Sequence, residues 1–153
     1  MKIRGFEVVK NECRQHPDAN IVLPTRADAH SAGYDFYCPI TITLQPAQKT
    51  LFSTDVKAYM QDDEVLEIYI RSSLGIKKGL MIPNNVGIID SSYYNNPSND
   101  GNIGMALVNT SGKEVTIEAG ERIAQGIFKK YLVADNDKPL SSERKGGFGS
   151  SGK

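Results

Sequence analysis

Residues 66–70 read Leu-Glu-Ile-Tyr-Ile, an alternation in which apolar side chains occupy every second position. Because successive side chains of a β-strand point to opposite faces of a sheet, this spacing places the three apolar residues on one face. The same period of two recurs at 40–44, 103–107 and 115–117, and turn-forming residues separate these stretches. Many short strands with regular turns predict an all-β barrel or sandwich.

The composition fits one soluble globular domain. The chain has 153 residues, of which 39% are apolar and 24% charged. Lys plus Arg and Asp plus Glu both number 18, so the net charge is zero and neither nucleic acid nor a membrane surface is expected as a partner. The apolar runs are far shorter than the roughly 20 residues of a transmembrane helix, and the first residues lack the apolar stretch of a secretory signal. We expect a cytoplasmic protein.

The cysteines and histidines do not form a metal-binding pattern. Cys13 and Cys38 are predicted to be reduced thiols, although the sequence leaves a disulfide between them open. His16 and His30 stand apart with no CxxC pair near them, so a structural zinc site is not expected.

Two segments depart from the strand pattern. Ser72 and Ser73 could cap one or two helical turns, and Gly79 would end them. The chain becomes polar and then glycine-rich near its end, with too little apolar surface to pack on its own domain. We therefore divide the sequence into a β-barrel domain over 1–135 and a flexible arm over 136–153. A disordered end without function is the alternative interpretation of that arm.

Two positions combine residues that could carry chemistry. Arg71 lies beside two hydroxyls at a predicted helix start and could bind phosphate, whereas the plainer interpretation is a capped helix with a surface arginine. Asp90 ends the apolar run 86–89, three residues before Tyr93. Because a buried carboxylate without a partner is costly, this position suggests a general base acting on water. The alternative is an aspartate that caps a turn.

Three weaker signals complete the set. Residues 32–35 place an aspartate at a strand start, and 120–125 place an arginine and an amide at another. Residues 147–153 fit G-x-x-x-x-G-K but lack the Ser/Thr and the helix that a Walker-type phosphate loop needs, so that function is rejected. Glycine-rich backbone beside Arg144 could still bind an anion, and Phe148 could stack on a flat ring.

Together, five segments resemble the motifs of the trimeric all-β dUTP pyrophosphatases (dUTPases). In order they are 32–35, 71–73, 84–93, 120–125 and 146–152. The resemblance implies a jelly-roll-like distorted β-barrel with one short helix and an extended C-terminal arm. It also implies hydrolysis of dUTP to dUMP and pyrophosphate by a homotrimer, with active sites at the subunit interfaces and the arm as a lid.

The resemblance also assigns roles to individual residues. Asp90 resembles the carboxylate that orients and deprotonates the attacking water, and Asp35 the one that helps position a Mg2+-bound triphosphate through water. Mg2+ would be held mainly by phosphates and water, so no direct protein ligand is expected. The expected substrate-binding residues are Arg71, Ser72, Ser73, Gln125, Arg144, Ser150 and Ser151 for the phosphates, Asn84, Gly87, Ile89, Gly104 and Phe148 for the uracil, Tyr93 for the deoxyribose, and Gly149 beside them in the arm.

Two features depart from the family pattern. Residues 94–102 form a longer excursion than the tight turn that usually follows the tyrosine, and its usual charged residue is missing. This excursion could bind a regulatory protein partner through residues 94–100. Arg144 lies one residue nearer the Gly-Gly-Phe than usual, so Lys145 could share its role.

Two other functions stay open on the sequence. A dCTP deaminase-related enzyme would share the fold and an Arg-Ser-Ser-like segment, although its chemistry needs a different acid/base residue. A regulatory protein could use the dUTPase fold to bind a macromolecular partner.

Overall fold

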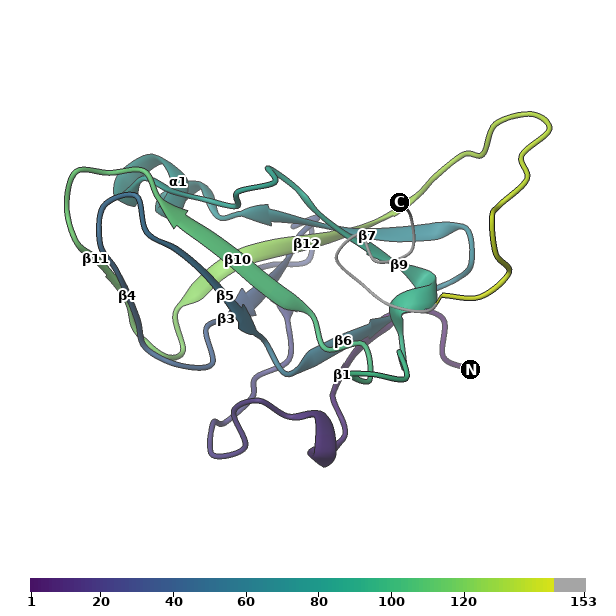
Figure 1. The fold of residues 1–153 in the computed structure, drawn as a ribbon, viewed down its shortest axis with the longest axis horizontal. Coiled ribbons are helices and arrows are strands. Elements are labelled where there is room, and N and C mark those ends of the chain that lie inside the picture. The colour runs from purple at the N-terminus through teal and green to yellow at the C-terminus, as the bar shows by residue number, and fades with distance from the viewer. Residues whose placement is uncertain (145–153) are drawn as a thin grey trace.

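Twelve short strands dominate the computed structural model of the chain, which describes residues 1–144 (Figure 1). Turns, one α-helix and two 3-10 helices connect the strands in this part of the chain. In chain order the elements are β1 Gly5–Val8, η1 Asn11–Cys13, β2 Thr25–Arg26, β3 Tyr34–Tyr37, β4 Ile42–Leu44, β5 Lys49–Ser53, β6 Val56–Tyr59, β7 Glu64–Ile70, α1 Ser72–Lys78, β8 Leu80–Met81, β9 Gly87–Asp90, η2 Ser91–Tyr93, β10 Gly104–Asn109, β11 Val115–Ile117 and β12 Arg122–Lys130.

The strands pair into four antiparallel sheets that share one core. The largest sheet has the order β2-β3-β12-β7-β9, and a second has the order β5-β10-β8. The pairs β1-β6 and β11-β4 contribute Ala58 and Leu44 to the same core. Figure 1 shows β10 crossing in front of β12, and buried residues of both strands, Leu107 and Ala124, belong to one core. This is the predicted all-β architecture.

The alternating stretches bury the side chains that their period selects. Leu66 and Ile68 of β7 are 0% and 2% exposed, and Ile103 and Leu107 are both 0% exposed. Glu67, between the first two, is partly exposed. Burying one such aliphatic side chain contributes about 1.5–3 kcal/mol, so the predicted pattern of period two is what closes the core.

The one α-helix of the described chain ends as predicted but begins differently. Gly79 adopts a left-handed conformation with φ of 67° and donates its N–H to the carbonyl of Leu74, which ends α1. The predicted serine cap is wrong, because Arg71 occupies the N-cap position and no side chain caps the helix. Within residues 1–144 no helix has both the length and the apolar character needed to cross a membrane.

The two cysteines are free thiols. Cys38 is buried at 2% exposure, and burial raises the pKa of its thiol to about 11, so it stays protonated near neutral pH. Cys13 is only partly buried.

The chain leaves the barrel after β12. Residues 131–144 form no helix or strand, and Leu132 and Leu140 are 97% and 96% exposed. Figure 1 shows this segment swinging away from the barrel and returning to η2. The division between barrel and arm after residue 135 stays a prediction.

A buried carboxylate, Asp55, ties the N-terminal loop to the barrel. Asp55 is 0% exposed and lies between β5 and β6. Its oxygens accept the backbone N–H groups of Gln15 and His16, both at 2.8 Å, and the Asn102 amide at 2.9 Å. Burial alone would raise the pKa of this carboxyl, but these hydrogen bonds lower it below its ordinary value. The loop is therefore held by a carboxylate that must be ionised.

Replacing Asp55 tests this link between charge and stability. Asp55→Asn should lower the free energy of unfolding by about 2–4 kcal/mol at pH 7, because buried donors lose their acceptor. A depressed folded-state pKa stabilises the protein above the unfolded pKa of about 3.9 and ceases to do so as pH falls through the folded pKa. The difference between variant and wild type should therefore shrink on acidification.

Urea unfolding at fixed protein concentration between pH 7 and pH 3 measures this difference. Asp18→Asn, an exposed change in the same loop, is the matched control. A stability difference for Asp55→Asn that stays constant with pH would contradict the assignment.

Candidate active site

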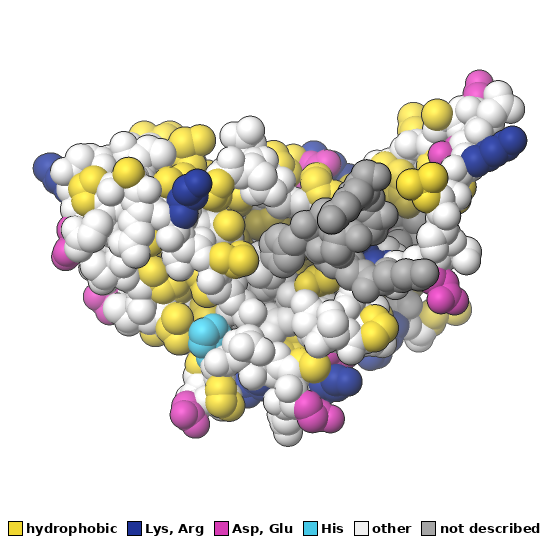
Figure 2. All heavy atoms as spheres, in the orientation of Figure 1, with side chains coloured by type: hydrophobic (Ala, Val, Ile, Leu, Met, Phe, Trp, Pro, Cys, Tyr) yellow, Lys and Arg dark blue, Asp and Glu magenta, His cyan; other side chains and the backbone are white. Residues whose placement is uncertain are grey.

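A cleft of about 570 Å³ opens between β9 and β10. On the face that carries β10, Figure 2 shows hydrophobic side chains across the middle and most charged side chains toward the edge. The cleft brings together the predicted site residues of the 84–93 segment with Gly104 and Arg144. Its full lining is Leu51, Ile68, Ile82, Pro83, Asn84, Gly87, Ile88, Ile89, Asp90, Tyr93, Gly104, Met105, Ala106 and Arg144.

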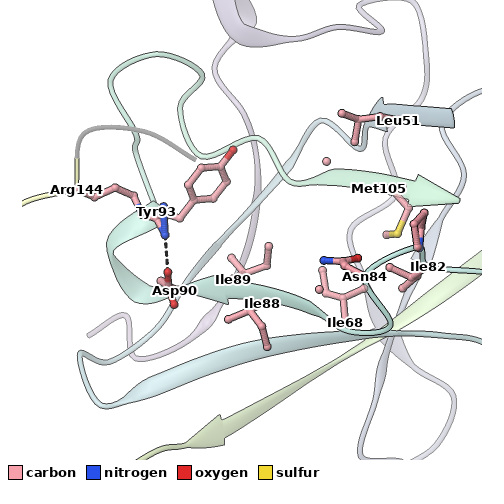
Figure 3. Close-up of a pocket in the computed structure, with 14 residues that line it drawn as sticks. Leu51, Ile68, Ile82, Asn84, Ile88, Ile89, Asp90, Tyr93, Met105 and Arg144 are labelled. Carbon is pink, nitrogen blue, oxygen red and sulfur yellow. Dashed lines mark hydrogen bonds and ion pairs between the residues drawn. The ribbon is translucent and has the colours of Figure 1, made fainter. Parts of the chain in front are cut away.

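The cleft has an apolar middle and two polar ends. In Figure 3, Asn84 lies at one end and the pair Asp90 and Tyr93 at the other, with β9 running between them. Gly87 packs so closely on β7 that an added Cβ would lie 3.2 Å from the Cβ of Ile68. In the described chain β9 is an edge strand that pairs only with β7, so its other edge carries backbone donors and acceptors suited to a planar ligand.

Asp90 is an exposed carboxylate with a cationic partner. Its side chain is 51% exposed and forms an ion pair with the guanidinium of Arg144, drawn as a dashed line in Figure 3. That guanidinium also donates to Ser92 Oγ at 3.2 Å and lies 5.3 Å from the centre of the Tyr93 ring. The sequence argument that Asp90 is buried without a partner is therefore wrong, because the strand ends at the protein surface.

A second cleft of about 370 Å³ lies between α1 and the start of β12. Its lining carries four cationic side chains against one acidic side chain, Glu121, and this excess of positive charge favours an anion. Arg71 and Ser73 were predicted to bind phosphate and line it, whereas Ser72 is exposed and lies outside both cleft linings. The cations are Arg71, Lys77, Lys78 and Arg122.

Asp35 sits beside this second cleft between two arginines. Its Oδ2 is 3.3 Å from Arg122 Nη1, and its Oδ1 is 3.9 Å from Arg71 Nε. The pairing of β3 with β12 places Gln125 opposite Asp35. Three of the predicted segments thus meet at one place. Arg122 was not among the predicted site residues, and only the register of β12, with its irregularity between Arg122 and Ala124, reveals its position.

Asp90 in the first cleft and Arg71 in the second are far apart within one chain. Asp90 pairs with Val65 of β7, and Arg71 follows six residues later, just beyond the other end of that strand. At about 3.3 Å per residue the two positions are separated by about 20 Å. Figure 1 shows the same separation, with α1 at one end of the molecule and β9 and η2 toward the other.

Four predicted substrate-binding residues cannot be placed. Phe148, Gly149, Ser150 and Ser151 lie outside the described residues, as does Lys145. Arg144 is therefore the part of the predicted arm that the structure places at the first cleft.

The barrel, with one cleft suited to a planar base and another suited to an anion, defines a nucleotide-binding β protein. The model of the dUTPase family matches residues 19–152, and the chain belongs to that family as one of its enzymes. The predicted recognition and jelly-roll-like fold are thereby confirmed.

Individual relatives agree with this assignment. The chain is 50% identical over 153 residues to the deoxyuridine 5'-triphosphate nucleotidohydrolase of Lactococcus lactis, covering 99% of each chain. It superposes on the crystal structure of the Streptococcus mutans dUTPase with a TM-score of 0.75 and 42% identity, covering 86% of this chain and 99% of that one. The dUTPase of Staphylococcus bacteriophage 80alpha with dUPNHPP, at 23% identity, full coverage of both chains and a TM-score of 0.70, shows the shared fold.

Gly33 offers a test of Gln125, which lies opposite Asp35 and outside the lining of the second cleft. A Cβ at this position would lie 2.4 Å from Gln125 Oε1 and 3.0 Å from its Cβ, so Gly33→Ala must displace the Gln125 side chain. We expect the affinity for pyrophosphate to fall about tenfold, because that is the loss in affinity that follows when one hydrogen bond to a charged group is removed. Calorimetric titration measures it. Gly112→Ala is the control, since nothing lies within 4 Å of its added Cβ, and equal affinities for the two variants would contradict the role of Gln125.

Proposed function

We propose that the chain hydrolyses dUTP to dUMP and pyrophosphate, with Asp90 activating the water. The observation that carries this proposal is that Asn84, Asp90 and Tyr93 line one and the same cleft in a member of the dUTPase family. Asp90 takes a proton from water, and the water oxygen forms a bond to the α-phosphorus. The bond from that phosphorus to the bridging oxygen breaks, and pyrophosphate leaves with the electron pair. A positioned general base of this kind contributes about 10²–10⁴-fold.

The apolar part of the first cleft suits the uracil ring. Asn84 and the free edge of β9 offer donors and acceptors, and Gly87 and Gly104 add no bulk beside them. Such a site can match the hydrogen-bonding pattern of uracil and leave the amino group of cytosine unpaired. A buried polar group without a partner strongly lowers the affinity for the cytosine nucleotide. Ile89 extends the apolar wall.

The sugar belongs beside Tyr93. The ring lines the cleft next to Asp90, and the guanidinium of Arg144 already lies near its face. A deoxyribose stacked on this ring leaves no room for a 2′-hydroxyl, so the ring sets the preference for deoxynucleotides. Arg144 then acts on the phosphates, together with the arm residues beyond it.

The phosphates require the second cleft, and one chain does not bring it to its own Asp90. A separation of about 20 Å along β7 far exceeds the reach of a triphosphate. We therefore infer a homotrimer in which Asp90 of one protomer and the Asp35–Arg71–Gln125 cluster of another meet on one nucleotide. The exposed apolar side chains Leu51 and Ile88, at 59% and 55%, are the kind of surface that an interface between copies covers.

Mg2+ fits this arrangement as part of the bound nucleotide. No group of three or more His, Cys, Asp or Glu side chains in residues 1–144 could hold a metal by itself. The side chain of Asp35, 13% exposed between two arginines, offers one carboxylate that could contact metal-bound water. Mg2+ keeps several waters and binds phosphates readily, and when bound it would neutralise charge on the triphosphate.

The other predicted functions have less support. The relatives are named as dUTP nucleotidohydrolases, which favours hydrolysis over a dCTP deaminase activity. A regulatory partner for residues 94–100 has a parallel in the phage 80alpha dUTPases described as controlling transfer of virulence genes, but that likeness of about 23% extends to the fold alone. Pyrophosphate release from dUTP, dCTP and UTP with Mg2+, with an assay for ammonia, separates these functions.

Asp90→Asn tests the general base. The amide keeps the shape of the side chain but cannot accept the proton, so we expect turnover of dUTP to fall by about 10²–10⁴-fold while nucleotide binding persists. Single-turnover kinetics and equilibrium binding measure the two quantities. Asp62→Asn, on an exposed turn away from both clefts, is the control. Wild-type turnover by the Asp90 variant would remove it from this role.

Mixed trimers test the shared site. Asp90→Asn and Arg71→Ala each should inactivate a trimer made of one variant. If one site takes Asp90 and Arg71 from different protomers, a refolded equal mixture should regain about a quarter of wild-type activity by random assortment. Refolding each variant alone is the control, and a mixture that stays inactive although trimeric would refute the shared site.

A further inference from the structure

The excursion at residues 94–102 packs against the barrel beside the candidate sugar site. Asn96, Asp100 and Asn102 are only 3–6% exposed. We propose that this excursion is a clamp that fixes the ring of Tyr93, with Asn99 as a positioning residue that sharpens the selection of deoxyribose over ribose. The proposal rests on the proposed dUTP hydrolysis and extends it to specificity.

The hydroxyl of Tyr93 is bonded from two sides by this excursion. It donates to the backbone carbonyl of Asn102 at 3.0 Å and accepts the side-chain amide of Asn99 at 2.6 Å. Figure 3 shows the hydroxyl on the side of the ring away from Asp90. Because the hydroxyl end of the side chain is held by these two bonds, the ring cannot rotate away about its bond to Cβ without breaking both of them.

Asn99 is itself held in place. Its Oδ1 accepts the N–H of Gly101 at 3.0 Å, which fixes the orientation of the amide toward Tyr93. Gly101 has φ of +81°, and an added Cβ would lie 2.6 Å from the carbonyl oxygen of Tyr93. The excursion therefore approaches the tyrosine backbone as closely as only glycine permits.

A buried lysine anchors the excursion to the barrel. Lys57 on β6 is 7% exposed, and its ammonium donates to Asp100 at 2.9 Å and to Asn95 at 2.7 Å. Asp100 also accepts the backbone N–H of Lys10 at 2.8 Å. Burial would raise the pKa of Asp100, but these two donors lower it, so this carboxylate stays ionised near neutral pH. These bonds therefore hold the excursion in place against β6 and the N-terminal segment.

The position of the Tyr93 ring matters because a ribonucleotide differs from the substrate by one hydroxyl. A Tyr93 ring that is held rigidly leaves no space for the 2′-hydroxyl of the ribose, whereas a ring that can move slightly away from the sugar admits it. Loss of the clamp should thus favour UTP more than dUTP. Binding of UTP should improve relative to dUTP, and the selectivity ratio should fall.

The test is a double-mutant cycle of Asn99→Ala and Tyr93→Phe. We expect each variant to lower the ratio of kcat/KM for dUTP to kcat/KM for UTP about tenfold. The double variant should lower it no further than Tyr93→Phe alone, because loss of the hydroxyl already removes the bond to Asn99 together with the bond to Asn102. Ser98→Ala, in the same segment but without a bond to Tyr93, is the matched control and should keep the wild-type ratio.

Three results would overturn the clamp. They are an unchanged ratio in Asn99→Ala, an equal loss in Ser98→Ala, and additive losses in the double variant. The unfolding midpoint and the oligomeric state of each variant show whether a loss is structural, and Tyr93→Phe keeps the ring if Asn99→Ala fails to fold. Absence of dUTP hydrolysis by the unmodified protein would instead refute the proposed function.

Discussion

Antiparallel pairing of β7 with β9 on one side and β12 on the other sets the positions of Asp90, Gln125 and Arg122. The pairing with β9 carries Asp90 to one end of β7, and the pairing with β12 carries Gln125 and Arg122 to the other. A shift of one residue in either register would turn the buried side chains outward and the exposed ones inward. The burial of Leu66 and Ile68 therefore fixes the active-site geometry as well as the core.

Local patterns in the sequence sufficed for the strands and for the segments that carry chemistry. The period of two at 66–70 and 103–107 marked core strands, and the motif residues Asn84, Asp90 and Tyr93 do share a cleft. The predicted burial of Asp90 was wrong because a strand ending at the surface looks the same in sequence as one ending inside. Arg122 was noted within the 120–125 segment but was not assigned to the site, because only long-range register reveals that it lies beside Asp35.

The separation of the two clefts has a physical logic. A planar base gains from apolar contacts and a few matched hydrogen bonds, whereas a triphosphate needs several cations. Cations such as Arg71 and Lys78 beside the base pocket would hold water there and weaken those contacts. Arg71 lies beyond the end of β7, three residues or about 10 Å from the Ile68–Gly87 pair of the base cleft, and this offset keeps the two environments distinct within one chain.

The buried Lys57 makes loop length and barrel composition interdependent. A designer who shortened the excursion to a tight turn would remove Asp100 and Asn95 from the ammonium and leave the more distant carboxylate of Glu7, at 3.9 Å, as its partner. Grafting a short turn from another scaffold therefore demands a simultaneous apolar replacement at position 57. Natural variation at these sites should for the same reason be correlated, with the lysine kept or lost together with its acidic partner.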